Sequence, residues 1–393
     1  MTIGWGYFYC EHILQAKESL ARTPETPVSS CAIHGKINVD TDSKEVTRLM
    51  GKLKSANLVA QLDQQIKQAA ESANKSLAAD PNMIANLAIV EVGADPASRV
   101  YIKQKLAKAQ ALGLTAVPFY LPADISQAKL NSTLDHLNTM FPAIILQAPL
   151  PKHLDFEQAV THIDPQHDAD GLNPINQASL LSDPHGQYPV ACTPQGICLW
   201  LTQILHTSSL EDAVDGKRVL VIGRSSLVGM PVALLLQNAN ATVTVWHSHS
   251  PQFTAADLQQ YDIIIAAAGQ HHMIKTSDLA DGTVAIDVGI HAVPDTTKKS
   301  GHRLEGDIEI SDPADLNRLD VTAVPGGVGP LTVEMLMLQA VALTELNCNP
   351  DQSVYQPTAT LKMLQAAADT ASTAAVKKFA QDQIDRTKEV TKR

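Results

Sequence analysis

The sequence predicts an α/β protein with two domains, and three observations support this prediction. Segments with strand-like and helix-like patterns alternate along the chain in two separate series, as in parallel α/β folds. In the second series, a glycine-containing loop stands between a strand and an apolar helix. The chain has 393 residues, a length that favours about two domains.

The first series combines apolar periodicity of the helical kind with short β-rich runs. Leucine and isoleucine recur at helical spacing in its first segment, and Gly113 stands where a helix would close. Ser98 is expected to cap the helix that Gly113 closes. We expect helices over 46–79, 98–112 and 126–138, and strands over 86–92, 115–120 and 143–147.

The second series repeats the order strand, glycine turn and helix, which is typical of a Rossmann-like unit. A connecting helix over 195–206 is expected to precede it, and a final helix over 332–346 to follow a glycine-rich loop. Its strands are expected over 218–222, 242–246, 262–267, 283–288 and 321–324.

These patterns divide the chain into four parts. The first domain is expected over 44–194 together with the helix 332–346, and the second over 195–331. Residues 1–43 are rich in Thr, Pro and Ser and lack periodicity, so either a disordered leader or an over-long start assignment is expected there. Residues 347–393 are predicted to form a helical or disordered extension.

Composition excludes several classes of protein. A net charge of -11 without a dense Lys/Arg tract offers no attractive field to nucleic acid or to a membrane surface. The longest apolar runs have the length of a strand, so we expect no segment to cross a membrane, and the N-terminus lacks the pattern of a secretory signal. Five cysteines without C-x-x-C spacing suggest neither a disulfide framework nor a zinc site. We therefore expect a cytoplasmic protein that needs no metal.

The loop between the strand 218–222 and the following apolar helix is a candidate phosphate-binding loop. Its glycines permit a tight turn, and backbone N–H groups at the start of the helix can face a pyrophosphate. Its spacing is not G-x-G-x-x-G, and an ordinary strand-to-helix turn explains the loop equally well when it stands alone. The candidate residues are Gly223, Arg224, Ser225, Ser226, Val228, Gly229 and Pro231.

The end of the next strand bears on the choice of dinucleotide. NAD enzymes of this plan usually place an acidic residue there to accept the ribose 2′-hydroxyl, but the chain continues from Trp246 with His247, Ser248 and His249. Because Arg224 could hold a 2′-phosphate, NADP is favoured over NAD. A metal site is the other interpretation of the histidines at 247, 249, 271 and 272, but no carboxylate cluster accompanies them, so solvated loop histidines are expected.

The first domain holds a second set of candidates. Tyr101 and Lys105 stand four residues apart and share one face of a helix, although an exposed pair of this kind is common. Gln147 ends a strand at the carboxyl edge of the predicted sheet, where ligands tend to bind. Asp168 and Asp170 flank Ala169 before Gly171; paired acids beside a glycine are more often a turn or a cap than a site.

Taken together and in order, these motifs resemble those of the bifunctional methylenetetrahydrofolate dehydrogenase/cyclohydrolases. The resemblance covers about 49–346, and it departs from the family pattern at Met50, His167 and His249, the last of which leaves Arg224 to hold a 2′-phosphate. The matching segments are Gly51-Lys52, Pro96-Ala97-Ser98 with Tyr101 and Lys105, Gln147 with Pro149-Leu150-Pro151, Asp168 to Gly171, Thr193-Pro194, the loop at Gly223, and Pro325 to Thr332.

The resemblance implies an N-terminal α/β folate-binding domain and a Rossmann-like NAD(P)-binding domain with a cleft between them. It implies that Lys105 serves hydrolysis of the methenyl group, that Tyr101 lies on or near the folate ring and that Gln147 positions the lysine. The carboxylate of Asp170 would accept two parallel N–H hydrogen bonds from the pterin. It also implies folate contacts for Pro325, Gly326, Gly327 and Thr332, and cofactor contacts for His247, Ser248, Gly269 and Ile290.

The implied function lies in one-carbon metabolism, in the interconversion of tetrahydrofolates that also supplies purine biosynthesis. The enzyme would oxidise 5,10-methylenetetrahydrofolate with NADP and hydrolyse the methenyl product to 10-formyltetrahydrofolate, as a homodimer. Two alternatives remain: a monofunctional dehydrogenase without the cyclohydrolase step, against which an intact Lys105 argues, and a folate- or nucleotide-binding pseudoenzyme.

Overall fold

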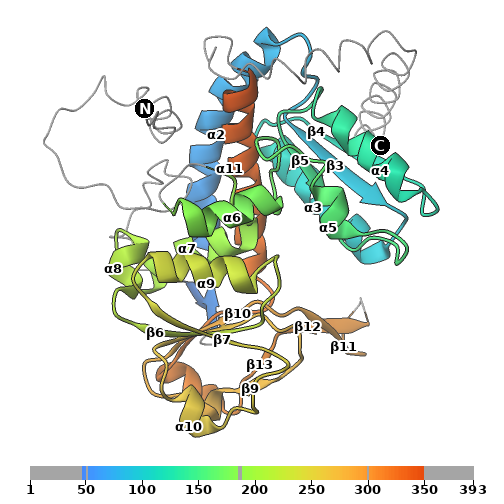
Figure 1. The fold of residues 1–393 in the computed structure, drawn as a ribbon. Coiled ribbons are helices and arrows are strands. Elements are labelled where there is room, and N and C mark those ends of the chain that lie inside the picture. The colour runs from blue at the N-terminus through green and yellow to red at the C-terminus, as the bar shows by residue number, and fades with distance from the viewer. Residues whose placement is uncertain (1–46, 50–51, 185–187, 299–300, 349–393) are drawn as a thin grey trace, which may run out of the picture. The chain divides into compact units, whose positions relative to one another are not determined.

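The computed structural model describes residues 47–49, 52–184, 188–298 and 301–348, which form two compact units (Figure 1). The 66–173 unit also contains the described residues from Met337 onward, and the 174–336 unit also contains those up to Gln65. The chain passes between these units after Gln65, Asn173 and Leu336. The functional domain boundary near 194 stays a prediction. The expected leader over 1–43 and the extension beyond Cys348 lie outside the described residues.

The 66–173 unit is built on a parallel sheet with the strand order β4-β3-β5. This agrees with the parallel α/β layer expected from the alternation of elements. The elements are α2 (Ala56–Ala79), which begins in the other unit, β3 (Leu87–Val92), α3 (Pro96–Ala111), β4 (Ala116–Leu121), α4 (Gln127–Leu137), β5 (Ile144–Leu146) and α5 (Phe156–Val160).

Both faces of this sheet are covered, and one large apolar cluster lies between the sheet and α4. Every residue of β3 is buried, so the strand runs through the interior rather than along an edge. Phe119 of β4 and Phe141 meet edge to face with their ring centroids 5.3 Å apart, and Leu130 and Leu134 of α4 pack into the same cluster. This apolar packing fixes the carboxyl ends of β3 and β5, from which the loops that carry polar side chains emerge.

The 174–336 unit contains a five-stranded parallel sheet with the order β14-β10-β8-β6-β7, as expected for a Rossmann-like unit. Its helices are α6 (Pro174–Ser182), α7 (Cys192–Ile204), α8 (Leu210–Val214), α9 (Gly229–Asn238), α10 (Ala255–Leu258), the 3-10 helices η1 (Thr276–Asp278) and η2 (Pro313–Asn317), and the first part of α11 (Val328–Cys348). Its strands are β1 (Thr47–Leu49), β2 (Lys52–Lys54), β6 (Arg218–Ile222), β7 (Thr242–Trp246), β8 (Ile263–Ala266), β9 (Ile274–Lys275), β10 (Val284–Asp287), β11 (His291–Pro294), β12 (His302–Glu305), β13 (Ile308–Glu309) and β14 (Asp320–Val321).

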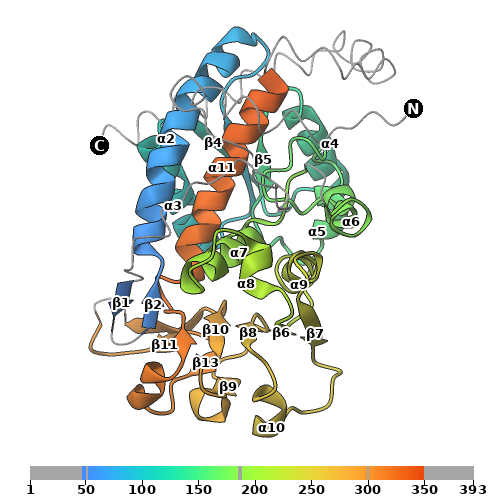
Figure 2. The ribbon, with the colours of Figure 1, turned by 90° about the vertical axis from the view of Figure 1, so that its left-hand side faces the viewer.

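Helices cover both faces of this sheet. Figures 1 and 2 show α9 on one face and α10 on the other. On the face of α10, Leu258 joins Ile264 and Ala285 of the sheet in one buried cluster. On the opposite face, α9 follows β6 directly and packs on β6 and β7. The carboxyl end of β6 and the first turn of α9 therefore meet at one edge of the sheet, where a dinucleotide would bind.

The largest correction to the expected elements concerns the predicted helix over 46–79. Its first part forms the antiparallel pair β1 and β2, and the helix begins only at Ala56. Leu53 of β2 forms a bridge with Thr322, and its carbonyl accepts the N–H of Ala323 at 2.8 Å. Pairing with a segment about 270 residues away outweighs the local helical pattern.

Three helix starts also differ from the expectation, and the first is that of α7, which begins three residues before the predicted start at 195. The residue that caps α3 is Asp95, whose carboxylate accepts the N–H of Ser98 at 2.8 Å, and not Ser98 itself. The final helix α11 begins at Val328, inside the glycine-rich loop, and not at Thr332. Gly113 closes α3 at a φ of +81°, as expected.

Helix α11 is the one helix in the described part of the chain that is long and apolar enough to cross a membrane. In its most apolar stretch, 67% of the residues are buried inside the fold, which is the property of a core helix in a soluble protein. Length and composition alone are therefore weak evidence for a membrane span.

Candidate active site

The 66–173 unit brings Lys105 and Gln147 together. Lys105 lies on α3, and Gln147 directly follows β5, with its own N–H bonded to the carbonyl of Val90 in β3. The Nζ of Lys105 donates to Oε1 of Gln147 at 3.0 Å, and Nε2 of Gln147 donates to the carbonyl of Ala148 at 2.8 Å. The second bond fixes the amide so that its oxygen faces the lysine. The amine is thus held by a neutral acceptor at the carboxyl edge of the sheet.

Tyr101 lies one turn before Lys105 on the same helix. Its side chain is 43% exposed, and the neighbouring Val100 is 56% exposed. Large side chains with this much exposed apolar surface are available to cover a flat ligand ring. The position on α3 agrees with the predicted shared face.

Asp168 and Asp170 play different parts in the loop between α5 and α6. Asp168 is 1% exposed and accepts the N–H groups of Gly171 and Asn173 at 3.0 and 2.7 Å, so it organises the turn. Asp170 is half-buried, and no hydrogen bond or ion pair within the described residues occupies its carboxylate. The turn interpretation therefore fits Asp168, whereas Asp170 is available to a ligand.

The loop that presents Asp170 is braced from two sides. Gln339 of α11 donates to the carbonyl of Ala169 at 2.8 Å. His167, one of the departures from the family pattern, bonds through Nδ1 to the carbonyl of Phe141 at 2.7 Å. Burial lowers the pKa of His167, which keeps the imidazole neutral. His167 thus acts here as a buried support for the loop.

In the 174–336 unit, the loop from Gly223 to Gly229 depends on close contact between backbone segments. Gly223 has a φ of +121°, and a Cβ atom there would lie 2.3 Å from the carbonyl oxygen of Ala267. A Cβ at Gly229 would lie 2.3 Å from the carbonyl oxygen of Gly223. Ser225 accepts the N–H of Val228 through Oγ at 3.2 Å and shapes the turn. Only glycine fits these two positions without a shift of the main chain.

The features around this loop fit a dinucleotide. Val228, the N-cap of α9, supplies no side-chain cap, so the positive end of the helix dipole can face an anion. Pro231 is buried in the first turn, and Ser226 is held through its carbonyl by Gln177 at 2.9 Å. Leu227 and Met230 are 42% and 40% exposed, so apolar surface surrounds the loop.

Arg224 lies near enough to His247 for its positive charge to act on the imidazole. The pKa of His247 is lowered mainly by loss of solvation and, to a smaller extent, by the positive charge of Arg224. Arg224 is exposed, and no carboxylate in the described part of the chain pairs with it. Ser248 is exposed, and the N–H of His249 donates to Nδ1 of His247 at 3.2 Å. Among the described residues, this site has an unpaired cation and no acid, which suits a 2′-phosphate better than a 2′-hydroxyl.

Two buried carboxylates fix the neighbouring loops. Oδ2 of Asp307 accepts the N–H groups of Ala268 and Gly269 at 3.1 and 2.9 Å, and its Oδ1 bonds Nε2 of His291 at 2.7 Å. Asp287 accepts the N–H of Asp307 at 2.8 Å, and burial raises the pKa of Asp287 to about 6. The backbone at Gly269 is thereby fixed.

The same two carboxylates hold the residues on either side of Ile290. The N–H of Gly289 donates to Oδ1 of Asp287 at 3.2 Å, and His291 bonds to Asp307, so both neighbours of Ile290 are held. Ile290 itself is 46% exposed. Sequence reasoning missed Asp287 and Asp307, for which the only local signal was an acid beside a glycine or a short strand.

The glycine-rich loop before α11 packs against the start of α2 and against α7. The Oγ of Ser55 donates to the carbonyl of Gly327 at 2.7 Å. The backbone N–H of Ser55 donates to the carbonyl of Gly326 at 3.1 Å. The hydroxyl oxygens of Thr332 and Thr193 lie 3.0 Å apart and share a hydrogen bond. The resemblance had matched Thr193 and Pro325 to Thr332 as separate segments, and the structure brings Thr193 and Thr332 into contact.

The expectation that His271 and His272 are merely solvated is wrong. Glu305 of β12 accepts a hydrogen bond from His271 and lies within ion-pair distance of His272. A carboxylate that is 33 residues away from His272 in the sequence therefore accompanies the pair, and the sequence pattern gave no sign of it. His247 and His249 have no such carboxylate partner among the described residues.

Comparison with known proteins places both units in one enzyme class. The family model of the tetrahydrofolate dehydrogenase/cyclohydrolase catalytic domain matches residues 51–170, and that of the NAD(P)-binding domain matches 191–348. The bifunctional protein FolD of Prochlorococcus marinus is 40% identical over 302 residues, which cover 76% of this chain and 95% of that protein.

Two further relatives extend this comparison. The mitochondrial C-1-tetrahydrofolate synthase of Saccharomyces cerevisiae is 39% identical over 259 residues; the match covers 65% of this chain but only 26% of that longer protein. The solved structure of the N5,N10-methylenetetrahydrofolate dehydrogenase-cyclohydrolase of Trypanosoma brucei, in complex with NADP and an inhibitor, matches with a TM-score of 0.65 at 31% identity. That match covers 75% of this chain and 97% of the other.

Proposed function

Because the chain belongs to the tetrahydrofolate dehydrogenase/cyclohydrolase family, we propose that it oxidises 5,10-methylenetetrahydrofolate with NADP and hydrolyses the methenyl product to 10-formyltetrahydrofolate. The observation that carries this proposal is the bond between Lys105 and Gln147 at the carboxyl edge of β5. An absorbance assay on the purified protein tests it by following NADPH formation and the rise and decay of the methenyl product. Formation of NADPH without decay of the methenyl product would favour a monofunctional dehydrogenase instead.

In the oxidation, the residues of the chain bind and align. Bound NADP supplies a nicotinamide carbon that accepts the hydride from the methylene group. Asp170 anchors the pterin through its unoccupied carboxylate, and Tyr101 covers the folate ring. Arg224 and the glycine loop hold the phosphates of the cofactor. The main contribution of the protein is alignment of donor and acceptor.

In the hydrolysis, water attacks the methenyl carbon, the bond from that carbon to N5 breaks, and a proton is released as 10-formyltetrahydrofolate forms. Lys105 moves the proton between water and the folate nitrogens, because its amine is the titratable group that Gln147 holds in place. A neutral amide positions the lysine without adding a second charge. No step assigned to these residues requires a metal.

A pseudoenzyme that only binds folate or nucleotide is the second candidate. The presence of all three proposed polar residues in this chain, Lys105, Asp170 and Arg224, argues against it. The same absorbance assay decides between the two, because a pseudoenzyme would form no NADPH.

We expect Arg224→Ala to raise the KM for NADP by about tenfold or more, with a much smaller effect on the KM for NAD, since one charge-assisted pair to the 2′-phosphate is lost. Steady-state kinetics with both dinucleotides measure the ratio. Arg218→Ala is the matched control, because Arg218 is also exposed in this unit but already bonds Gln260 at 3.1 Å. Equal effects of Arg224→Ala on the two dinucleotides would contradict this assignment.

The segments outside the family match are proposed to be dispensable for the chemistry, because the matched residues run from 51 to 348. A chain that spans Lys44 to Asn349 should retain nearly the full kcat of both reactions. Kinetics and circular dichroism should be measured together. A folded but inactive shortened chain would show that a terminal segment contributes to the site.

The domain assignment, assembly and location are further parts of the proposal. We assign folate binding to 44–194 with the helix 332–346, and dinucleotide binding to 195–331. A cytoplasmic homodimer is supported by the family resemblance and by the small number of cysteines, five in 393 residues. Light scattering on the purified protein measures the mass of the assembly.

A further inference from the structure

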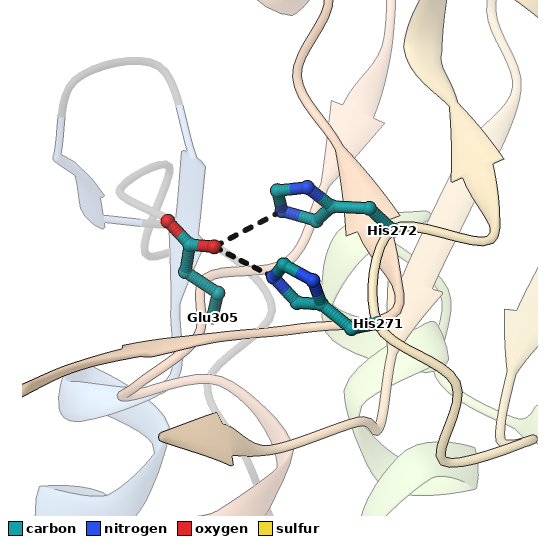
Figure 3. Close-up of side chains that lie close together, drawn as sticks. All are labelled: His271, His272 and Glu305. Atoms are coloured by element: carbon teal, nitrogen blue, oxygen red, sulfur yellow. Dashed lines mark hydrogen bonds and ion pairs between the residues drawn. The ribbon is translucent and has the colours of Figure 1, made fainter. Parts of the chain in front are cut away.

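Three side chains outside the proposed folate and dinucleotide contacts converge in the 174–336 unit (Figure 3). His271 and His272 come from the turn between Gly269 and β9, and Glu305 ends β12. Nε2 of His271 lies 2.7 Å and Nε2 of His272 lies 3.3 Å from the same carboxylate oxygen, Oε2 of Glu305. The two imidazole rings are stacked with their centroids 3.8 Å apart.

Two imidazoles and one carboxylate make up a ligand set that zinc and related divalent transition metals prefer. Bonds of about 2.0–2.2 Å in a tetrahedral site keep ligand atoms roughly 3.4 Å apart. The distance from His272 to Glu305 already has this value, and the distance from His271 to Glu305 needs to open by less than about 1 Å. All three ligand atoms lie within 4.8 Å of one another.

We propose that His271, His272 and Glu305 bind one divalent transition-metal ion, for which Zn²⁺ is the reference, with solvent in the remaining position. The side chains are 39%, 32% and 19% exposed, so an ion can reach them from solution. This site is additional to the proposed folate chemistry, which assigns no role to any of the three residues.

Neighbouring groups orient the carboxylate toward the histidines. Nε of Arg303 donates to Oε1 of Glu305 at 2.5 Å and leaves Oε2 directed at the two rings. Glu305 also pairs across the β11 and β12 ribbon with His291, which fixes its backbone. Partners of this kind, one shell outside the ligands, are a common feature of metal sites.

The backbone that carries the histidines is fixed as well. Asp307 holds the N–H groups of Ala268 and Gly269, just before the two histidines, and the N–H of His272 donates to the carbonyl of Gly306 at 3.4 Å. The ligands therefore come from two segments that are already fastened to each other. A bound ion would add a link between the turn at 270–273 and β12.

The test is calorimetric titration of ZnCl₂ into the full chain after treatment with a chelator, at neutral pH. The wild-type protein should bind one equivalent more than the double variant His271→Ala/His272→Ala. Glu305→Gln keeps the shape of the side chain and should weaken binding at this site at least about tenfold. Thermal unfolding of each variant without metal shows that it is folded.

A matched control is His162→Ala. Nδ1 of His162 bonds Asp135 at 2.8 Å, so this variant removes a histidine from a lone histidine–carboxylate pair. It should keep the zinc stoichiometry and affinity of the wild type. The proposal would be overturned if the wild type, Glu305→Gln and the double variant bound zinc with equal stoichiometry and affinity. The three side chains would then form only an ion pair. Because the readout is binding and not turnover, it stays informative if the proposed enzyme activity fails.

Discussion

A Lys105→Gln enzyme is expected to accumulate methenyltetrahydrofolate, because water attack on the methenyl carbon requires proton transfer and hydride transfer does not. Loss of a general acid or base typically costs about 10²–10⁴-fold in rate. The cyclohydrolase rate should fall by that factor, and the dehydrogenase rate much less. Both rates can be followed in one cuvette, through the absorbance of NADPH and of the methenyl product.

Lys103→Gln provides the matched control for this prediction. Lys103 lies on the same helix and is exposed, so its replacement should leave both rates near those of the wild type. A purely structural role of Lys105 would lower both activities in parallel with the folded fraction. Hydrolysis at the wild-type rate in Lys105→Gln would refute the assignment and leave the proton transfer to another residue.

Asp170→Ala should lower kcat/KM for both reactions by about 10- to 100-fold, since a hydrogen bond to a charged group contributes about 1.5–3 kcal/mol. The Kd for NADP, measured by fluorescence titration, should stay near the wild-type value. The carboxylate has no partner within the described residues that its loss would leave unpaired. The melting temperature is therefore expected to change little.

Asp168→Ala gives the opposite pattern and serves as the comparison. The buried carboxylate of Asp168 accepts two backbone N–H groups, and its removal leaves them unsatisfied inside the fold. The melting temperature should fall clearly. If Asp170→Ala behaved in the same way, with a lowered melting temperature and a normal folate KM, Asp170 would be a turn residue.

Local patterns were sufficient to predict the parts of the fold whose determinants lie close in sequence. Strands β6 and β7 have the predicted bounds, and α4 (Gln127–Leu137) lies within one residue of the predicted range 126–138 at both ends. Buried parallel strands read as short apolar runs between turns, so periodicity and glycine positions identify them. The pair of Lys105 and Gln147 followed from the family resemblance, and the structure shows the contact.

The errors come from contacts between distant segments. The strand at 52–54 could not be predicted, because the residues that pair with it are at 322 and 323. For the same reason the sequence did not reveal Glu305 beside His271 and His272, or Asp307 beneath Gly269. Each of these depends on a hydrogen bond that spans more than 30 residues, which no local window contains.

The close packing at Gly223 and Gly229 has a consequence for how this enzyme can evolve. In an apolar core, an enlarged side chain can be accommodated when a facing side chain becomes smaller. Here the obstacle to a side chain at Gly223 is the carbonyl of Ala267, and the obstacle at Gly229 is the carbonyl of Gly223. Main-chain atoms cannot be trimmed by a second substitution. A library randomised at these two codons, with all other positions free to vary, should therefore return glycine at both.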